Sequence, residues 1–458
     1  MRNMRGETLL VRLPILFISI LLFAPPLFAQ NKKSIEPLPK LLSLREQQAV
    51  RERWLKTRLD TMLLTMMRRH QIEMWIVTNE EFHPDPLVHY IAPPIPYQGR
   101  RDFFIFTDRG ADKLERIALV RYPEEHLRYF FEVLNPPRRE IPDALRRIVE
   151  ERKPKTIALN TGGTRGVTSS LTHDAYLFLV ETLGTEYSKR FVPAAPLIIE
   201  YLDTRLPDEL EHYRTAVAVT DILTQRALSN EVITPGRTTV GDVRWWLLQQ
   251  VNDLGLDVWF QPDFRIQRRN KESSQTQQFL SVADESTVIE RGDVVHVDFG
   301  INYMGLSTDW QKHAYVLRAG ERDAPEGLKR AMAQTNRLQD VLFKHIKVGA
   351  SGPDVYDATM AEMKREGIEA MIYSHSVGNQ GHALGASIDF RRPADGAAAD
   401  AEPAFRAGSY TSIELNTSTS VPEWGGQKVT IMMEDDAYLT PQGMQWFRPR
   451  QTQFYLIR

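Results

Sequence analysis

The stretch VVHVDFGINYMGLSTDWQKHAYVL, residues 294–317, decides the fold of the C-terminal half. Its alternating apolar residues predict a strand that ends in Asp298. The segment over residues 302–305 supplies the small and polar residues of a turn. If the hairpin turns about Tyr303-Met304, Asp298 lies directly opposite Asp309. Two opposed carboxylates repel each other, so this hairpin predicts a bound cation.

The same hairpin also carries two histidines, His296 and His313. In the register that opposes the two aspartates, His296 faces Gln311 and Val294 faces His313. We therefore expect His296 and His313 to lie on the face that carries the aspartates, where either could contact a substrate.

Three further polar residues stand among apolar neighbours in the last third of the chain. They are His382 in QGHALG, Glu414 in SIELN and Glu434 in IMMEDD. Taken singly, a lone histidine is usually a satisfied polar residue, and an acidic run at the end of a predicted strand, here Lys428–Met433, is usually solvated. Together with the two aspartates they form a set that is costly to bury without positive charge. A pair of divalent metal ions would supply that charge.

Composition sets broad limits. With 458 residues, 42% hydrophobic and 25% charged, the chain is expected to form two soluble globular domains. A net charge of −2 gives no electrostatic argument for a nucleic-acid partner. The chain has no cysteine, which excludes disulfides, thiol catalysis and a lipoprotein cysteine.

The N-terminus is typical of a secretory signal over residues 1–29. Arg2, Arg5 and Arg12 precede the apolar run Leu13–Phe28, and Ala29 offers a cleavage site. The competing interpretation is a retained anchor helix, but the run is short for a membrane span and prolines interrupt it. We expect a periplasmic or secreted protein with no stable membrane anchor after cleavage.

Alternating helices and strands predict an α/β domain over residues 30–204. Its expected elements are a helix over Leu42–Gln71, strands over 74–78, 102–107, 117–120 and 156–159, and a helix over 141–153. A second domain over residues 205–458 begins with two helices, one from Pro207 and one that Thr238-Thr239 can cap. Strands then dominate, with helices expected over 327–346 and 352–367.

The order of the polar motifs resembles the creatinase, aminopeptidase P, prolidase and methionine aminopeptidase family. The resemblance rests on Asp-x10-Asp, then His-x-Leu-Gly, Ile-Glu and Glu-Asp-Asp, and it covers roughly residues 206–458. It implies an α/β (α+β) fold in which an N-terminal creatinase-like α/β domain precedes a C-terminal pita-bread catalytic domain. A divergent exported Xaa-Pro peptidase-like branch is the expected place of this chain.

The resemblance also implies two divalent metal ions, Mn, Co or Zn. Asp298 would bind one ion, Asp309 and Glu434 would bridge both, and His382 and Glu414 would complete the other shell. A water shared by the ions would attack an amide carbonyl. A short peptide or a small amide is the implied substrate, and a homodimer is compatible with the family.

Three departures from the family pattern concern the residues around the metals. No histidine stands near Ser281, where the peptidases carry one, so His313 or His296 is expected to take its place. A second histidine, His375, precedes His382 by seven residues instead of four and remains a candidate acid or base. Met432 stands where an arginine is common, and Arg268 or Arg269 could supply that charge, or form only a basic surface edge.

These observations predict a metal-dependent Xaa-Pro aminopeptidase or dipeptidase-like enzyme. Two alternatives stay open. The same metals could hydrolyse a non-peptide C–N bond, or the fold could serve as a catalytically silent binding protein.

Overall fold

The computed structural model describes residues 35–94, 99–276, 278–391 and 403–458. The predicted secretory segment over residues 1–29 lies outside them. Residues 37–458 form one compact unit, which contains two large sheets. In the described part of the chain, no helix has the length and apolar character needed to cross a membrane.

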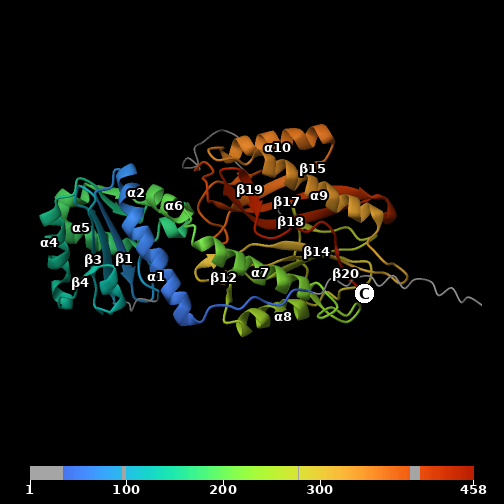
Figure 1. The fold of residues 1–458 in the computed structure, drawn as a ribbon, viewed down its shortest axis with the longest axis horizontal. Coiled ribbons are helices and arrows are strands. Elements are labelled where there is room, and N and C mark those ends of the chain that lie inside the picture. Colours follow the sequence, from blue (N-terminus) through green and yellow to red (C-terminus); the bar gives the residue numbers. More distant parts are fainter. Residues whose placement is uncertain (1–34, 95–98, 277, 392–402) are drawn as a thin grey trace, which may run out of the picture. The chain divides into compact units, whose positions relative to one another are not determined.

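The N-terminal half is built on a mixed six-stranded sheet in the order β4-β3-β2-β1-β5-β6 (Figure 1). Its strands are β1 (Met74–Glu80), β2 (Arg101–Asp108), β3 (Leu114–Leu119), β4 (Glu132–Leu134), β5 (Ile157–Leu159) and β6 (Phe191–Pro193). Along β2, Phe104 and Phe106 pack into one apolar layer, whereas Phe103 and Ile105 pack into the other. Both faces of the sheet are therefore buried, as in other α/β folds.

Two helix layers cover this sheet. One layer is formed by α1 (Leu44–Thr61), α2 (Leu63–Arg69) and α6 (Ala195–Asp203), and the other by α4 (Ile141–Arg152) and α5 (His173–Ser188). The first helix begins at Ser43, whose hydroxyl and the Glu46 carboxylate form a capping box. The predicted α/β half is thus confirmed, with the predicted helix over Leu42–Gln71 divided in two.

The C-terminal half is a curled antiparallel half-barrel based on a nine-stranded sheet. Along its main path the order is β16 (Ile388–Asp389), β15 (Glu369–Ser376), β17 (Tyr410–Val421), β18 (Gln427–Thr440), β14 (Gln311–Val316), β11 (Val294–Asp298) and β8 (Asp263–Gln267). Two more strands, β19 (Gly443–Trp446) and β20 (Tyr455–Ile457), pair with β18 and β14. The predicted α+β architecture of this half is thus confirmed.

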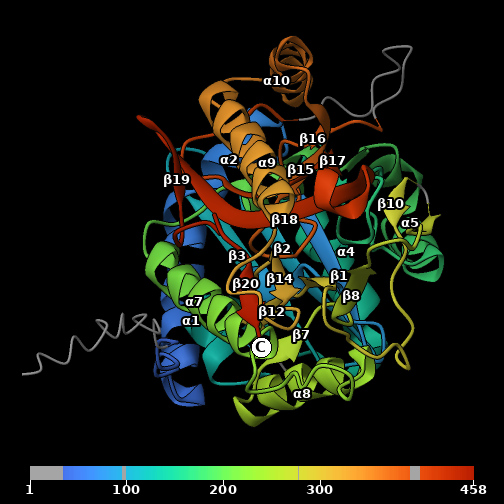
Figure 2. The same cartoon turned by 90° about the vertical axis from the view of Figure 1, so that its right-hand side faces the viewer.

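Four helices support the curl in two pairs. The helices α7 (Glu209–Ala227) and α8 (Val240–Asp253) share a core with β8 and β11, and α9 (Glu326–His345) and α10 (Gly352–Glu366) share one with β17 and β18. Figure 2 shows α9 and α10 beside β17 and β18, away from α7 and α8. Residues on the strand faces that these helices leave uncovered are free to form a site.

The predicted hairpin register was wrong by two residues. The turn is centred on Met304-Gly305, both at positive φ, between β12 (Ile301–Tyr303) and β13 (Leu306–Ser307). Moving the turn centre by one residue shifts every partner by two, so Asp298 lies opposite Gln311. Glycine takes a positive φ without strain, which fixes the turn at Gly305. Because the shift is even, the residues stay on their predicted faces.

The predicted end of the last long strand was also wrong. Strand β18 continues through Glu434 to Thr440 because β17 pairs with it along its whole length. The acidic run, which in most proteins would be solvated at a strand end, is consequently buried, with Asp435 and Asp436 fully covered. Burial of three successive acidic residues requires specific partners for each of them.

A buried ion pair joins the two parts of the sheet. Strands β14 and β18 meet at the single register pair Gln311↔Glu434. Beside it, Lys312 Nζ lies 2.7 Å from Asp435 Oδ1 and donates to the Glu434 carbonyl, and both charged side chains are almost fully buried. Gln339 of α9 donates to the other Asp435 oxygen. The pair therefore holds together two strands and a helix.

We expect Lys312→Met to lower the free energy of unfolding by about 3–5 kcal/mol, because it leaves a buried Asp435 carboxylate without its cation. Urea denaturation measures this change. Lys329→Met is the matched control, since Lys329 forms its ion pairs at the surface and should change the free energy by about 0–1 kcal/mol. Equal losses for the two variants would contradict a structural role for the buried pair.

Candidate metal centre

The predicted ligands from distant strands converge in three overlapping groups. One group contains Asp298, Asp309 and Glu434, and another contains Glu414, Glu434 and His375. Within each group, one donor atom per residue lies within 4.8 Å of the others. The third group contains Asp309, His375 and His382. Strands β11, β15, β17 and β18, with the loop before β14, supply all the ligands except His382, which follows β15.

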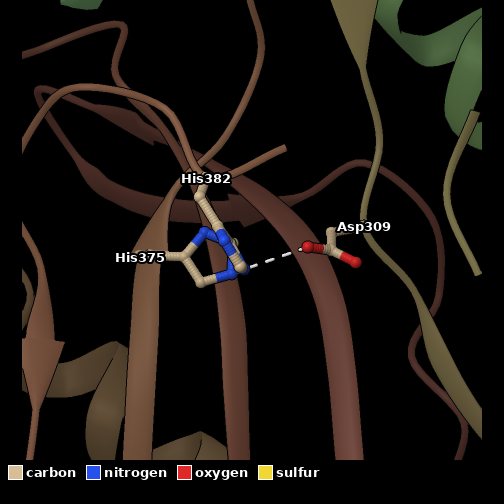
Figure 3. A group of neighbouring side chains, drawn as sticks. All are labelled: Asp309, His375 and His382. Carbon is tan, nitrogen blue, oxygen red and sulfur yellow. Dashed lines mark ion pairs between the residues drawn. The ribbon is translucent and has the colours of Figure 1, made fainter. Parts of the chain in front are cut away.

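His375 stands at the centre of the cluster. Its Nε2 lies 3.6 Å from one oxygen each of Asp309, Glu414 and Glu434. The ring's Nδ1 lies 2.9 Å from the Ser376 carbonyl oxygen, which can only accept a hydrogen bond. Nδ1 therefore carries a proton, and Nε2 is the ring nitrogen that faces the three carboxylates. Figure 3 shows this ring aimed at Asp309.

His382 lies at the exposed rim of the same group. Its ring centroid is 4.5 Å from that of His375, at nearly a right angle (Figure 3). Its other side packs against Trp259, with ring centroids 5.1 Å apart. A side chain at Gly381 would collide with the Trp259 ring, so glycine is needed for this approach. Burial and the nearby His375 lower the pKa of His382 to about 4, so its ring is neutral at pH 7.

The loop that carries His382 is also held from the N-terminal half. Arg165 Nη1 donates to the His382 carbonyl oxygen at 2.6 Å. The same nitrogen lies 3.4 Å from the Ala383 carbonyl oxygen. The guanidinium thus restrains the backbone that places His382 beside the cluster.

The carboxylates crowd one another strongly. Glu414 and Glu434 are direct cross-strand partners, which is the least favourable arrangement for like charges. Burial, and then the charge of Glu434, raise the pKa of Asp298, Asp309 and Glu414 well above their usual range. In the absence of a cation these groups hold protons tightly.

Gln311 is a central residue of the cluster that the sequence did not identify as functional. Its side-chain amide nitrogen donates to Glu414 at 2.6 Å and to Asp298 at 3.2 Å. Its carbonyl oxygen lies 2.9 Å from Nε2 of His296, which must donate. His296, a predicted substrate contact, is therefore buried behind Gln311 and orients it.

Arg265 lies beside the cluster. It donates to Asp263 at 2.6 Å and lies 4.0 Å from Asp298 Oδ2. The predicted Arg268 instead forms a two-pronged ion pair with Asp293, at 2.7 Å for both oxygens. The sequence did not reveal that Arg265, and not Arg268, lies near the carboxylates. Arg265 reaches this position because β8 pairs with β11, which places it opposite His296.

His313, a predicted acid or base, lies in the core of the sheet. It is fully buried, and its Nε2 is 2.7 Å from the Met432 carbonyl oxygen. Burial lowers the pKa of His313 from 6.5 to about 3. No contact between its side chain and the four carboxylates is found in the described residues. Its position is that of a neutral core residue.

An aromatic wall borders the cluster on the side of Glu414. Tyr373 is buried beside Glu414, and Phe279 and Phe390 pack on it as partly exposed rings. Ser281, where the family resemblance implies a histidine, shares a hydrogen bond with the Thr276 hydroxyl instead. The wall offers an apolar surface beside the candidate ligands.

The residues present fit divalent cations. His375 Nε2, Asp298 Oδ1 and Glu434 Oε2 are buried and have no hydrogen-bond partner among the residues that the structure describes. Unpartnered buried acceptors are costly unless a cation or another donor binds them. Carboxylates with one imidazole form a donor set that suits Mn, Co or Zn.

Stability should depend on pH through His313. Between about pH 6.5 and pH 3 the unfolded chain binds a proton on this residue that the folded chain excludes. The contribution of neutral His313 to the free energy of unfolding is therefore complete above pH 6.5 and is lost as the pH falls toward 3. His313→Gln should flatten this dependence in urea unfolding compared at neutral and mildly acidic pH. The exposed His83→Gln is the matched control. An unchanged slope in His313→Gln would contradict the burial of a neutral ring.

Solved structures share this fold at low sequence identity. The X-Pro aminopeptidase from Thermotoga maritima is 18% identical with a TM-score of 0.64, over 86% of this chain and 99% of that one. A dipeptidase from Pyrococcus horikoshii is 16% identical with a TM-score of 0.62, over 88% and 100%. The Xaa-Pro dipeptidase from Bacillus anthracis is 17% identical with a TM-score of 0.58, over 90% and 100%.

Sequence comparison gives a family but no individual relative. No curated protein matches the chain. The profile of metallopeptidase family M24 matches residues 211–441. Because this match spans half of the chain and includes every candidate ligand, the chain belongs to metallopeptidase family M24.

Proposed function

We propose that this protein is an exported M24 peptidase that binds two divalent ions and cleaves short peptides beside a proline. The observation that carries the proposal is the position of His375 Nε2, which lies 3.6 Å from one oxygen each of Asp309, Glu414 and Glu434. The basic and apolar segment over residues 1–29 supports export. The Xaa-Pro activities named for the Thermotoga and Bacillus structures support the choice of substrate.

Five residues would hold the ions: Asp298, Asp309, His375, Glu414 and Glu434. When bound, divalent ions in such sites acidify a water molecule and polarise the substrate carbonyl. We assign the imidazole ligand to His375 because its second nitrogen is fixed by the Ser376 carbonyl, which is the usual partner arrangement of a metal-bound histidine.

The remaining residues would act on the substrate. His382 is exposed and neutral at pH 7, so its one N–H can donate to the substrate carbonyl or leaving group. The aromatic wall of Phe279, Tyr373 and Phe390 would accept the proline ring. Gln311 would hold Asp298 and Glu414 in place through its amide.

Metal content separates the roles of the two histidines. We expect about two ions per chain in the metal-replete wild type and in His382→Ala, but fewer in His375→Ala, because only the latter loses a ligand. In His382→Ala the loss of a hydrogen-bond donor should lower kcat/KM by on the order of 10²–10⁴. Elemental analysis and peptide turnover measure both effects. Retained metal in His375→Ala, with loss in His382→Ala, would reverse the assignment.

Substrate choice is tested with matched dipeptides and tripeptides that contain proline or alanine after the first residue. We expect metal-dependent cleavage of the proline peptides, abolished in Glu434→Gln and unchanged in Glu369→Gln, an exposed glutamate at the start of β15. If no peptide is cleaved but a small amide is, the protein is a hydrolase of a non-peptide C–N bond and not a peptidase. No turnover of either class, with ligand binding preserved, would indicate a binding protein.

The contact of Arg165 with the His382 loop should tune catalysis without affecting metal. We expect Arg165→Gln to lower kcat/KM about three- to tenfold through KM, since one charged hydrogen bond at the surface is lost. Arg165→Lys, which keeps a donor, should recover part of the loss. A fall in metal content would show that Arg165 supports the whole fold of the site instead.

A further inference from the structure

A second cavity lies in the N-terminal half, apart from the metal cluster. It has a volume of about 360 Å³, which falls within the range of small-molecule sites. It sits where β1 and β3 end and β2 begins, at the carboxyl edge of the parallel strands of this sheet. Ligands of open α/β sheets bind at this edge.

Four arginines line this cavity: Arg100, Arg101, Arg121 and Arg138. Arg101 is already neutralised, because its Nη2 lies 2.6 Å from Glu80 and its guanidinium covers the Phe178 ring. We refer to the other three as the arginine triad.

The triad lacks counter-charges. Across the described residues, no carboxylate forms an ion pair with Arg100, Arg121 or Arg138. Glu81 is the acidic residue on the lining, and one carboxylate is fewer than three guanidinium groups require. The three guanidinium groups are exposed, so solvent screens their mutual repulsion, and they are accessible to an anion that their positive field attracts. Guanidinium groups pair with carboxylate and phosphate oxygens in a two-pronged geometry.

Apolar side chains form another part of the lining, the apolar wall. Phe103 is fully buried beneath the surface, and Ile141, Pro142 and Phe178 contribute to the lining. Charged and apolar groups in one cavity favour a ligand with two parts. A free inorganic ion would satisfy only the first part.

We propose that this cavity binds a small organic anion whose carboxylate or phosphate contacts the arginine triad and whose ring or short apolar body rests on Pro142 and the partly exposed Phe178. The proposal does not depend on peptidase activity, since none of the candidate metal ligands lines the cavity.

The binding is tested by calorimetry on the full-length, metal-replete protein with four probes: phenylacetate, phenyl phosphate, inorganic phosphate and benzyl alcohol. We expect phenylacetate or phenyl phosphate to bind, and the stronger of the two identifies the anionic group. Inorganic phosphate should bind more weakly and benzyl alcohol not measurably. Equal binding of inorganic phosphate would overturn the role of the apolar wall.

Variants separate this cavity from the metal centre. The double substitution Arg121→Gln and Arg138→Gln should weaken probe binding by about 10–100-fold, because charged hydrogen bonds are lost. Glu434→Gln should leave the binding unchanged, which excludes capture by the metals. Arg139→Gln is the matched control, because Arg139 is exposed beside Arg138 and does not line the cavity.

Three outcomes would overturn the proposal. They are absence of binding at millimolar probe, binding that survives the double substitution, and binding of heparin with no binding of the small probes. The last outcome would assign the arginines to a surface for long polyanions.

Discussion

The direct cross-strand pairing of Glu414 with Glu434 is the constraint on which the rest of the site depends. Twelve successive register pairs between β17 and β18 hold the two carboxylates together, so neither can move away without breaking the sheet. Asp298 and Asp309 add to the same buried volume. The fold therefore stores electrostatic repulsion that protons or bound cations relieve, and the sheet that creates it also builds the core.

The charged and polar residues around the cluster explain why this repulsion stays available for a ligand. Lys312 is committed to Asp435, and Arg265 to Asp263, so neither cation fully neutralises the inner carboxylates. Gln311 donates to Asp298 Oδ2 and Glu414 Oε1. Asp298 Oδ1 and Glu434 Oε2 are buried without a hydrogen-bond partner among the described residues. A site that had evolved only for stability would have satisfied these atoms, since unpartnered buried acceptors are costly.

Much of this arrangement could be predicted from sequence, and the failures have physical reasons. Alternation placed Asp298 and His296 on one face correctly, but only the turn geometry at Gly305 could fix the register. Glu434 was expected at a strand end because nothing in an acidic run reveals that β17 covers it. Whether His375 or His382 faces the carboxylates depends on where β15 ends, and element ends are the least predictable feature of a sequence. Arg265 and Gln311 gain their positions from strand pairing, which local patterns do not encode.

The most direct test is anomalous diffraction from crystals of the protein grown with Mn²⁺. We expect two peaks about 3.5–4 Å apart, within bonding distance of the carboxylates, with Nε2 of His375 bound to one of them. Two ions coordinated by His382 in place of His375 would correct the ligand assignment alone. No peak among these residues at saturating Mn²⁺ would contradict the central claim that the paired carboxylates exist to bind metal.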